Sequence, residues 1–378
     1  MKKSLIALAV LAASSGAAMA QSSVTLFGIV DASVGRVSGS GAGNRVGLNS
    51  GGYNTSRIGF RGTEDLGGGL AASFWLEGQI LADTGSQGTG DTGGSLFGRR
   101  STVSLSGAFG EVRLGRDFTA SFANQLAFDP FAATGFGSAN LDNGLGRRTL
   151  AGATTGSEVL QSSTARASNQ ISYFLPNTLG GFYGQLQYGF GETISTANND
   201  RYGDTYGARV GYANGPLNVG GAYQLRRGSA GNGAATGLGV ALNSSSRDYE
   251  VGTIGATYDF GVVKPFVQVN IERAEAVAGL PRARLNSYLV GASAPLGAGE
   301  LRASAIRYDL KDSGNDANKF AIGYNYNLSK RTAVYTNVAT VRNKGASIQT
   351  ISGGGLASTG VSAGGNSTGF EFGVRHAF

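Results

Sequence analysis

The feature that most constrains the fold of this chain is an alternation of apolar and polar residues with a period of two. In residues 182–190, Leu186 and Phe190 fall on one face of an extended strand and Gln187 falls on the other. The same alternation runs through 217–226, 263–272 and 319–328. Because successive side chains of a β-strand point to opposite faces, this pattern predicts strands with one oily and one wet face. It does not assign the faces of residues 301–309 and 331–342.

Long apolar runs are missing from the chain. After Ala20 there is no stretch of about 18 apolar residues, the length that a helix needs to cross roughly 30 Å of hydrocarbon. The charged fraction of 15% lies below the roughly 25% of an ordinary soluble domain. With 19 phenylalanines and 15 tyrosines, a chain containing 64 glycines is still expected to fold. We predict one large all-β unit.

Connections between the alternating segments come in two lengths. Short turns are predicted at 64–69, 106–110, 177–181, 215–216, 296–299 and 329–330. Long polar loops are predicted at 37–55, 83–95, 118–167, 193–204, 229–245, 276–282, 311–318 and 343–367. Eight long loops at one end, each joining two strands, give sixteen strands with both chain ends on the short-turn side.

Two architectures satisfy this pattern: a large soluble β-sandwich or propeller, and a transmembrane β-barrel. A soluble protein would carry many surface charges, whereas here charge is scarce and the wet face holds glutamine, asparagine, arginine and glycine. A closed barrel pairs every backbone polar group, and sixteen strands enclose a lumen too wide for side chains to fill. We therefore predict an all-β fold, a 16-stranded antiparallel transmembrane β-barrel. Aromatic residues near segment ends fit interfacial girdles, the alternative being core positions: Phe60, Trp75, Tyr258, Phe260, Phe370 and Phe378.

The first twenty residues have the pattern of a leader. Lys2 and Lys3 precede an apolar stretch at 5–13, and small residues follow up to Ala20. This three-part pattern is typical of a secretory signal peptide and is too short to span a bilayer stably. We predict a signal peptide at 1–20, cleaved after Ala20, and one barrel domain at 21–378. The alternative is an N-terminal membrane anchor.

Five sequence blocks are distinctive: SVTLFGIVDA at 23–32, SRIGFRGTEDLGGGL at 56–70, FGRRSTVSLSG with FGEVRLGRDF across 97–118, FDPF at 128–131, and a terminal GVRHAF. Together they resemble the general diffusion porins of Gram-negative outer membranes, in the form found in the β-proteobacterial class. The resemblance covers nearly the whole chain. It implies a location in the outer membrane, a homotrimer, and a third long loop, at about 118–167, folded inward to narrow the pore at mid-height.

The C-terminal strand adds to this resemblance. One of its faces carries Phe370, Phe372, Val374, His376 and Phe378. A terminal phenylalanine resembles the signal read by the outer-membrane barrel-insertion machinery. We therefore expect this machinery, outer-membrane lipids and lipopolysaccharide as partners. His376 stands where that signal prefers an apolar or aromatic residue, and we interpret it as an interfacial or subunit-contact ring.

Residue types that catalysis or cofactor binding needs are scarce. With no cysteine and a single histidine, His376, the chain has no disulfide framework and no zinc site of the usual Cys/His kind. A Ser-His hydrolase is not expected, because its base would have to lie at the end of the last strand. Glycine-rich strings fall in loops, and positive charge is dispersed, which favours neither nucleotide nor nucleic-acid binding. We predict no enzyme activity, no cofactor and no metal.

The informative charges are arginines on the wet faces. Arg57 alternates with Ile58, and Arg100 shares a face with Thr102. A lipid-facing arginine at mid-depth would cost roughly 2–4 kcal/mol, so a lumen position is favoured. The resemblance implies an arginine cluster on the barrel wall, facing acidic residues of the long loop. Matching motif by motif assigns Arg57, Arg100, Arg116 and Arg166 to the wall, and Asp129 and Glu158 to the loop.

The assignment of Arg116 has a structural requirement. Strict alternation from Leu114 would point Arg116 outward, so a lumen position needs a β-bulge or a place beyond the hydrocarbon zone. An alternative role for all these arginines is to pair with neighbours and hold the loop against the wall.

These observations lead to a functional hypothesis: passive diffusion of small hydrophilic solutes and ions through a water-filled pore. Guanidinium groups facing carboxylates across a gap orient dipolar solutes, and an excess of arginine predicts weak anion selectivity. One alternative is a non-conducting outer-membrane barrel that acts as an adhesin or receptor through its long loops. Another is an exported soluble β-protein with lectin-like or hydrolytic activity.

Overall fold

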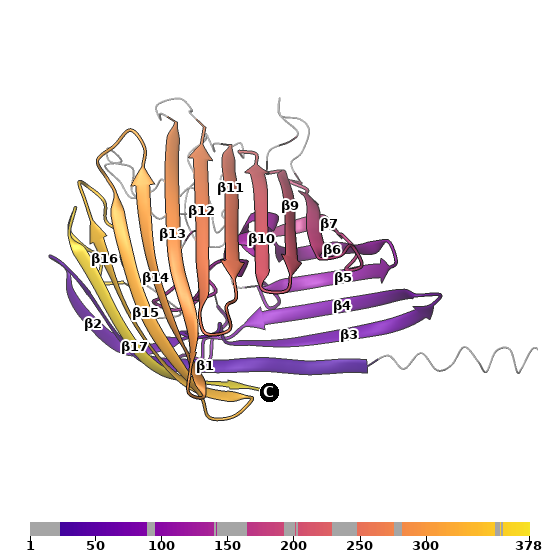
Figure 1. Cartoon of the computed structure of the whole chain (residues 1–378), viewed down its shortest axis with the longest axis horizontal. Helices are drawn as coiled ribbons and strands as arrows, with labels where there is room; N and C mark the ends of the chain where they lie inside the picture. Colours follow the sequence, from indigo (N-terminus) through magenta and orange to yellow (C-terminus); the bar gives the residue numbers. More distant parts are fainter. Residues whose placement is uncertain are drawn as a thin grey trace, which may run out of the picture.

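The computed structural model describes residues 23–88, 95–139, 141, 165–192, 201, 203–228, 248–275, 282–351, 356 and 358–378. Within these ranges, seventeen strands form one antiparallel sheet, in which chain neighbours lie side by side (Figure 1). The predicted signal peptide at 1–20 and the loop residue Glu158 lie outside the described residues.

Each strand from β3 onward pairs with the next strand along the chain. The bounds are β1 Ser23–Gly39, β2 Gly43–Ser50, β3 Arg57–Gly67, β4 Leu70–Gln79, β5 Arg100–Gly107, β6 Gly110–Phe118, β7 Arg166–Phe174, β8 Phe182–Gly189, β9 Thr205–Asn214, β10 Leu217–Arg226, β11 Tyr249–Tyr258, β12 Lys264–Ala274, β13 Ala283–Leu296, β14 Gly299–Leu310, β15 Ala317–Asn327, β16 Thr332–Asn343 and β17 Asn366–Ala377.

The sheet closes on itself through β1. Residues 29–39 pair with β17, while on the other edge residues 23–29 pair with β3 and residues 32–39 pair with β2. Because β2 and β3 lie end to end along the same edge of β1, they count as one strand of the wall. The wall therefore has sixteen strand positions, which confirms the predicted 16-stranded barrel. At the seam, the N–H of Phe378 donates to the carbonyl oxygen of Gly28 at 3.0 Å, and the reverse bond measures 3.1 Å.

The prediction of a long loop at 37–55 is wrong for most of its length. β1 continues to Gly39, and after a tight turn β2 returns along it as far as Ser50. Glycine and serine fill this stretch, so it has no clear alternation and resembles a loop in the sequence.

The short turns at the other end of the barrel are confirmed. Two residues join β5 to β6, and another two join β9 to β10. In the turn between β3 and β4, Gly67, Gly68 and Gly69 have φ values of +82°, +62° and +80°. Only glycine adopts these angles without strain, which explains the GGG string at this turn.

Apolar side chains cover the outer face of the wall. Leu186 on β8 is 61% exposed, whereas its neighbour Gln187 is 6% exposed. On β12, Val267 is 49% exposed and Gln268 is 2% exposed. Soluble proteins show the reverse distribution. The oily face of the alternation therefore points outward and the wet face points inward, as predicted.

Leu186 offers a test of this orientation, because it lies near the middle of β8 on the outer face. Leu186→Arg should destabilise the folded barrel in lipid by about 2–4 kcal/mol, since a guanidinium at the bilayer midplane loses its hydration. Urea unfolding in lipid vesicles measures this loss. The control Leu186→Ala adds no charge and should cost clearly less. Equal losses in the two variants would mean that this face does not contact hydrocarbon.

Between β6 and β7, the described residues 119–139 and 141 lie against the inner face of the wall. Their one helix, α2 (Ala120–Ala127), starts after Thr119, whose hydroxyl accepts the N–H of Phe122 at 3.2 Å. The amide nitrogen of Gln125 donates to Oδ1 of Asn270 on β12 at 2.9 Å. No helix within the described ranges is both long and apolar enough to cross a membrane.

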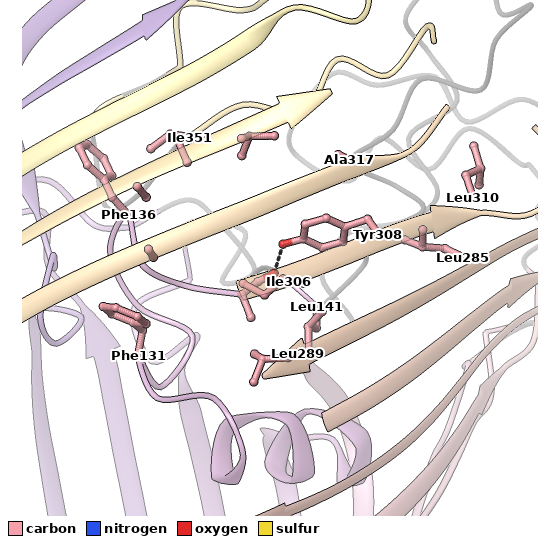
Figure 2. Packing of buried hydrophobic residues seen from close by; sticks show 14 of the residues in the cluster. Phe131, Phe136, Leu141, Leu285, Leu289, Ile306, Tyr308, Leu310, Ala317 and Ile351 are labelled. Carbon is pink, nitrogen blue, oxygen red and sulfur yellow. Dashed lines mark hydrogen bonds between the residues drawn. The ribbon is translucent and has the colours of Figure 1, made fainter. Parts of the chain in front are cut away.

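The residues after α2 pack against the wall through large apolar side chains. Figure 2 shows Phe131 and Leu141 of this segment in one group with Leu289 and Ile306 of the wall. The hydroxyl of Tyr308 donates to a backbone carbonyl of the same segment. We call residues 119–139 together with Leu141 the inner segment. Under it, the inner face of the barrel carries buried apolar residues such as Leu289 and Ile306.

Candidate functional site

Three arginines gather around Glu77 on the inner face of β4. Arg57 places Nη1 3.3 Å from Oε1 of Glu77, and Arg99, next to β5, places Nε 2.6 Å from the same oxygen. Arg166 of β7 donates Nε to the carbonyl oxygen of Arg99 at 2.7 Å. The charges of Arg99 and Arg166 both act on Arg57. Because several guanidinium groups share one carboxylate, this region carries a net positive charge.

A second group of charges lies beside it on β5 and β6. Arg100 places Nε 3.5 Å from Oδ2 of Asp117. Arg113 places Nη1 2.6 Å from the same oxygen, and its Nε lies 2.9 Å from Oε1 of Glu111. Together with the first group and a neighbouring arginine of β3, these residues form what we call the arginine cluster. It has six arginines and three carboxylates, namely Arg57, Arg61, Arg99, Arg100, Arg113 and Arg166 with Glu77, Glu111 and Asp117.

Arg116 follows a β-bulge. The register between β6 and β7 shifts just after Gly115, which has a φ of +120°. Arg116 donates Nε to the carbonyl oxygen of Gly98 at 2.6 Å and Nη1 to the hydroxyl of Ser168 at 2.9 Å. The bulge that a lumen position requires is thus present. These two bonds tie Arg116 to the chain beside the cluster rather than to the carboxylates of the cluster.

Trp75 lies on the inner face, which corrects its assignment to an interfacial girdle. The guanidinium carbons of Arg100 and Arg61 lie 4.6 and 5.0 Å from the centre of its ring system. Its Nε1–H donates to Oε2 of Glu77 at 3.1 Å. Trp75 lies two residues before Glu77 on the same strand, so both side chains point to the same face. This position along the strand predicts the face of Trp75 correctly, whereas its aromatic character does not. The other residues assigned to the girdles are exposed: Phe60, Tyr258, Phe260, Phe370 and Phe378.

Asp129 lies in the inner segment and faces the backbone of that segment. Its carboxylate accepts N–H bonds from Phe131 at 2.9 Å and from Ala133 and Ala139 at 3.0 Å each. Burial raises the pKa of Asp129, and these backbone donors partly offset the rise. The cation that acts on Asp129 most directly is Lys319 of β15. The structure therefore does not bring Asp129 to the arginine cluster, whose acidic partners come from the wall.

Two buried carboxylates that sequence analysis missed attach inward-lying backbone to the wall. Glu371 of β17 accepts the N–H of Phe136 at 2.9 Å and the side-chain amide of Asn337 at 2.8 Å. Asp31 of β1 accepts the N–H groups of Tyr53 at 2.9 Å and Asn54 at 2.6 Å. Both are carboxylates in the middle of a strand on its wet face, and this position is the sequence signal that could have identified them.

The chemical capacity of this inner wall is electrostatic. Within the described residues, no group of three or more histidine, cysteine, aspartate and glutamate side chains could hold a metal ion. The arginine cluster presents guanidinium N–H groups and an excess of positive charge, which attract and orient anions.

Comparison with known proteins gives a consistent result. The family model described as Gram-negative porin matches residues 7–346. Outer membrane porin protein 32 of Delftia acidovorans is 45% identical over 383 residues, covering 100% of both chains. The solved anion-selective porin from Comamonas acidovorans superposes with a TM-score of 0.80 at 40% identity, covering 95% of this chain and 100% of that one. The trimer form of OmpT from Vibrio cholerae shares the fold, with a TM-score of 0.62 at 14% identity, covering 94% of this chain and 99% of that one.

Proposed function

Since this chain belongs to the Gram-negative porin family, we propose that it forms an anion-selective pore whose narrowest part lies beside the arginine cluster. Membership of the family makes it an outer-membrane porin, through which small hydrophilic solutes diffuse. The proposal adds the sign of the ion selectivity and the residues that cause it.

The observation that carries this proposal is the excess of guanidinium groups in the arginine cluster. Its six arginines face three carboxylates. In a water-filled lumen with low-dielectric walls, fixed positive charge raises the local concentration of anions and lowers that of cations. No covalent bond forms or breaks, so the solute gradient alone drives transport. The related porin from Comamonas acidovorans is described as anion-selective, which supports the same sign.

Each residue assigned from the sequence has a place in this proposal. Arg57, Arg100 and Arg166 form the basic wall, and Arg116 extends it beyond the bulge. The inner segment narrows the lumen, and Asp129 supports it by binding its backbone. Glu158 keeps its predicted place in the same loop.

Reversal potentials across planar bilayers test the sign of selectivity. With potassium chloride more concentrated on one side, the purified protein should pass chloride more readily than potassium at neutral pH. Clear cation selectivity would reject the proposal. A correctly folded barrel without conductance would favour the adhesin or receptor alternative.

Removing the charge of Asp117 should change the ion selectivity in the opposite direction to removing an arginine. The Oδ2 atom of Asp117 partly neutralises Arg100 and Arg113. Asp117→Asn keeps the side-chain shape and removes one negative charge. The chloride-to-potassium permeability ratio should therefore rise, by up to about sixteenfold, because a charge about 5 Å from the ion path changes the local concentrations of chloride and potassium about fourfold each in opposite directions. Reversal potentials measure it, with Asp312→Asn on an exposed loop as the control that should leave the ratio unchanged. A fall at Asp117 would contradict the proposed role.

We propose the assembly and export of the protein on further grounds. Val24, Leu26 and Val34 leave apolar surface exposed on the outer face of β1, which suits contact with other subunits of a homotrimer. The remaining apolar outer face suits outer-membrane lipids and lipopolysaccharide. Phe378 is the residue that the insertion machinery would read. The signal peptide would leave Gln21 as the first residue, which N-terminal sequencing of the outer-membrane protein checks.

A further inference from the structure

Six arginines of the described inner wall lie over an aromatic ring. In these pairs the guanidinium carbon lies 4.2–5.2 Å from the ring centre: Arg61 with Phe27 and Trp75, Arg100 with Trp75, Arg113 with Phe174, Arg166 with Phe118, Arg209 with Tyr183, and Arg302 with Tyr53 and Phe131. Arg61, Arg209 and Arg302 make no ion pair with any residue that the structure describes. Arg209 also donates Nε to Oδ1 of Asn124 at 3.2 Å, and for Arg61 and Arg302 the rings are the contacts that the described residues show.

Rings and carboxylates support a guanidinium in different ways. A carboxylate that orients an arginine also cancels its charge, whereas an aromatic ring attracts the cation through its quadrupole and leaves the net charge unchanged. An arginine with neither partner would spread its charge over many rotamers. A pore that needs fixed, uncancelled positive charge is therefore better served by rings.

Trp75 is the ring where two of these contacts meet. It lies under Arg61 and Arg100, and Phe27 packs against it at 5.0 Å between ring centres with an interplanar angle of 61°. The bond from its Nε1–H to Glu77 fixes the orientation of the indole. Arg61 is solvent-exposed on the lumen side, so its charge is available to a passing ion.

We propose that Trp75 is a positioning residue for ion selectivity, which holds Arg61 and Arg100 at fixed places in the lumen without neutralising them. This inference rests on the proposed anion-selective pore and names a determinant of its selectivity that carries no charge itself. It predicts that selectivity depends on an aromatic ring at this position and not only on the arginines.

Two variants separate ring support from lost volume. Trp75→Phe and Trp75→Leu both remove the Nε1–H bond to Glu77 and both shorten the side chain, but only the first keeps a ring. In Trp75→Leu the chloride-to-potassium permeability ratio should fall by about two- to fivefold, the range expected for a lost cation–π contact. In Trp75→Phe most of the ratio should survive. Phe74→Leu, on the outer face of the same strand, is the matched control and should not change the ratio.

A double-mutant comparison identifies the arginine through which Trp75 acts. In an Arg61→Gln background, Trp75→Leu should reduce the permeability ratio by less than it does alone, because coupled residues are not additive. Equal ratios in the Phe and Leu variants, in a wild-type pore that is anion-selective, would overturn this inference and leave the proposed function intact. A wild-type pore that prefers cations would instead overturn the proposed function.

Fluorescence tests the same inference without altering Trp75, which is the single tryptophan of the chain. If uncancelled guanidinium groups lie over the indole, iodide should quench its emission more strongly than neutral acrylamide does. The difference should shrink as sodium sulfate screens the charges, and Arg61→Gln should reduce it. Iodide quenching no stronger than acrylamide quenching at low salt would overturn the inference, whatever the conductance shows.

Discussion

A channel in which Arg57, Arg99 and Arg166 are all replaced by glutamine should lose most of its preference for anions. Arg57 and Arg99 pair with Glu77, and Arg166 lies beside them. Removing these three guanidinium groups would cancel the excess of three positive charges in the arginine cluster. One unit charge about 5 Å from an ion in water changes its energy by about 0.8 kcal/mol, or about fourfold in local concentration. The chloride-to-potassium permeability ratio, measured from reversal potentials, should fall about tenfold or more.

The matched control removes the same number of charges elsewhere. Arg282, Arg307 and Arg331 are exposed and lie outside the arginine cluster. Replacing these three by glutamine should leave the permeability ratio nearly unchanged, because water and salt screen exposed charges beyond about 10 Å. An equal fall in both triple variants would assign the selectivity to the total charge of the protein. High salt should weaken the effect in the cluster for the same reason.

The fold could be predicted where each face of a strand meets a different medium. On β8 and β12 one face meets hydrocarbon and the other meets the lumen, so the alternation is clean. On β14 and β16 it is blurred, because buried apolar residues such as Ile306 and Val341 also occupy the inner face under the inner segment. Both faces are then oily, and no periodicity can tell them apart.

The arginine cluster could be predicted only in part. Parity and motif placed Arg57 and Arg100 on the wet face, where they pair with Glu77 and Asp117. Sequence reasoning missed Arg99. This residue precedes β5, so the alternation of the strand does not assign its side chain to either face. Sequence reasoning also looked for the acidic partners in the long loop, because the register that places Glu77 opposite Gly59, one step along the same face from Arg57, cannot be read from the sequence alone.

Glycines of the inner wall show what composition alone could not explain. A Cβ at Gly255 would lie 2.4 Å from Cγ of Phe128, and one at Gly291 would lie 2.6 Å from Cγ of Pro130. Any larger residue at these two positions would push the inner segment away from the wall. Some of the many glycines therefore lie in the wall where the inner segment packs against it, and their lack of a side chain makes room for that segment. In the sequence, such a glycine looks the same as one in a turn.

Replacing Glu371 by alanine should loosen the inner segment and raise single-channel conductance several-fold. The carboxylate accepts bonds from the N–H of Phe136 and from the side chains of Ser33, Asn49 and Asn337. Each buried donor left without an acceptor costs about 1–3 kcal/mol, so the variant favours a state in which water reaches these groups. The segment must then move off the wall at Phe136. Ions would pass farther from the arginine cluster, and anion preference should fall as conductance rises.

Single-channel recordings test this coupling, with Glu64→Ala as the control because Glu64 is exposed near the end of β3 and carries the same charge. Lys319 also holds the segment, through the carbonyl oxygen of Ser138. Adding Lys319→Ala to Glu371→Ala should therefore increase conductance further, because two separate attachments would be lost. Native gel mobility of the oligomer establishes that the variants are folded. Unchanged conductance in the folded double variant would show that the segment keeps its place without these bonds, and that the width of the pore is set by the apolar packing of Phe131 and its neighbours instead.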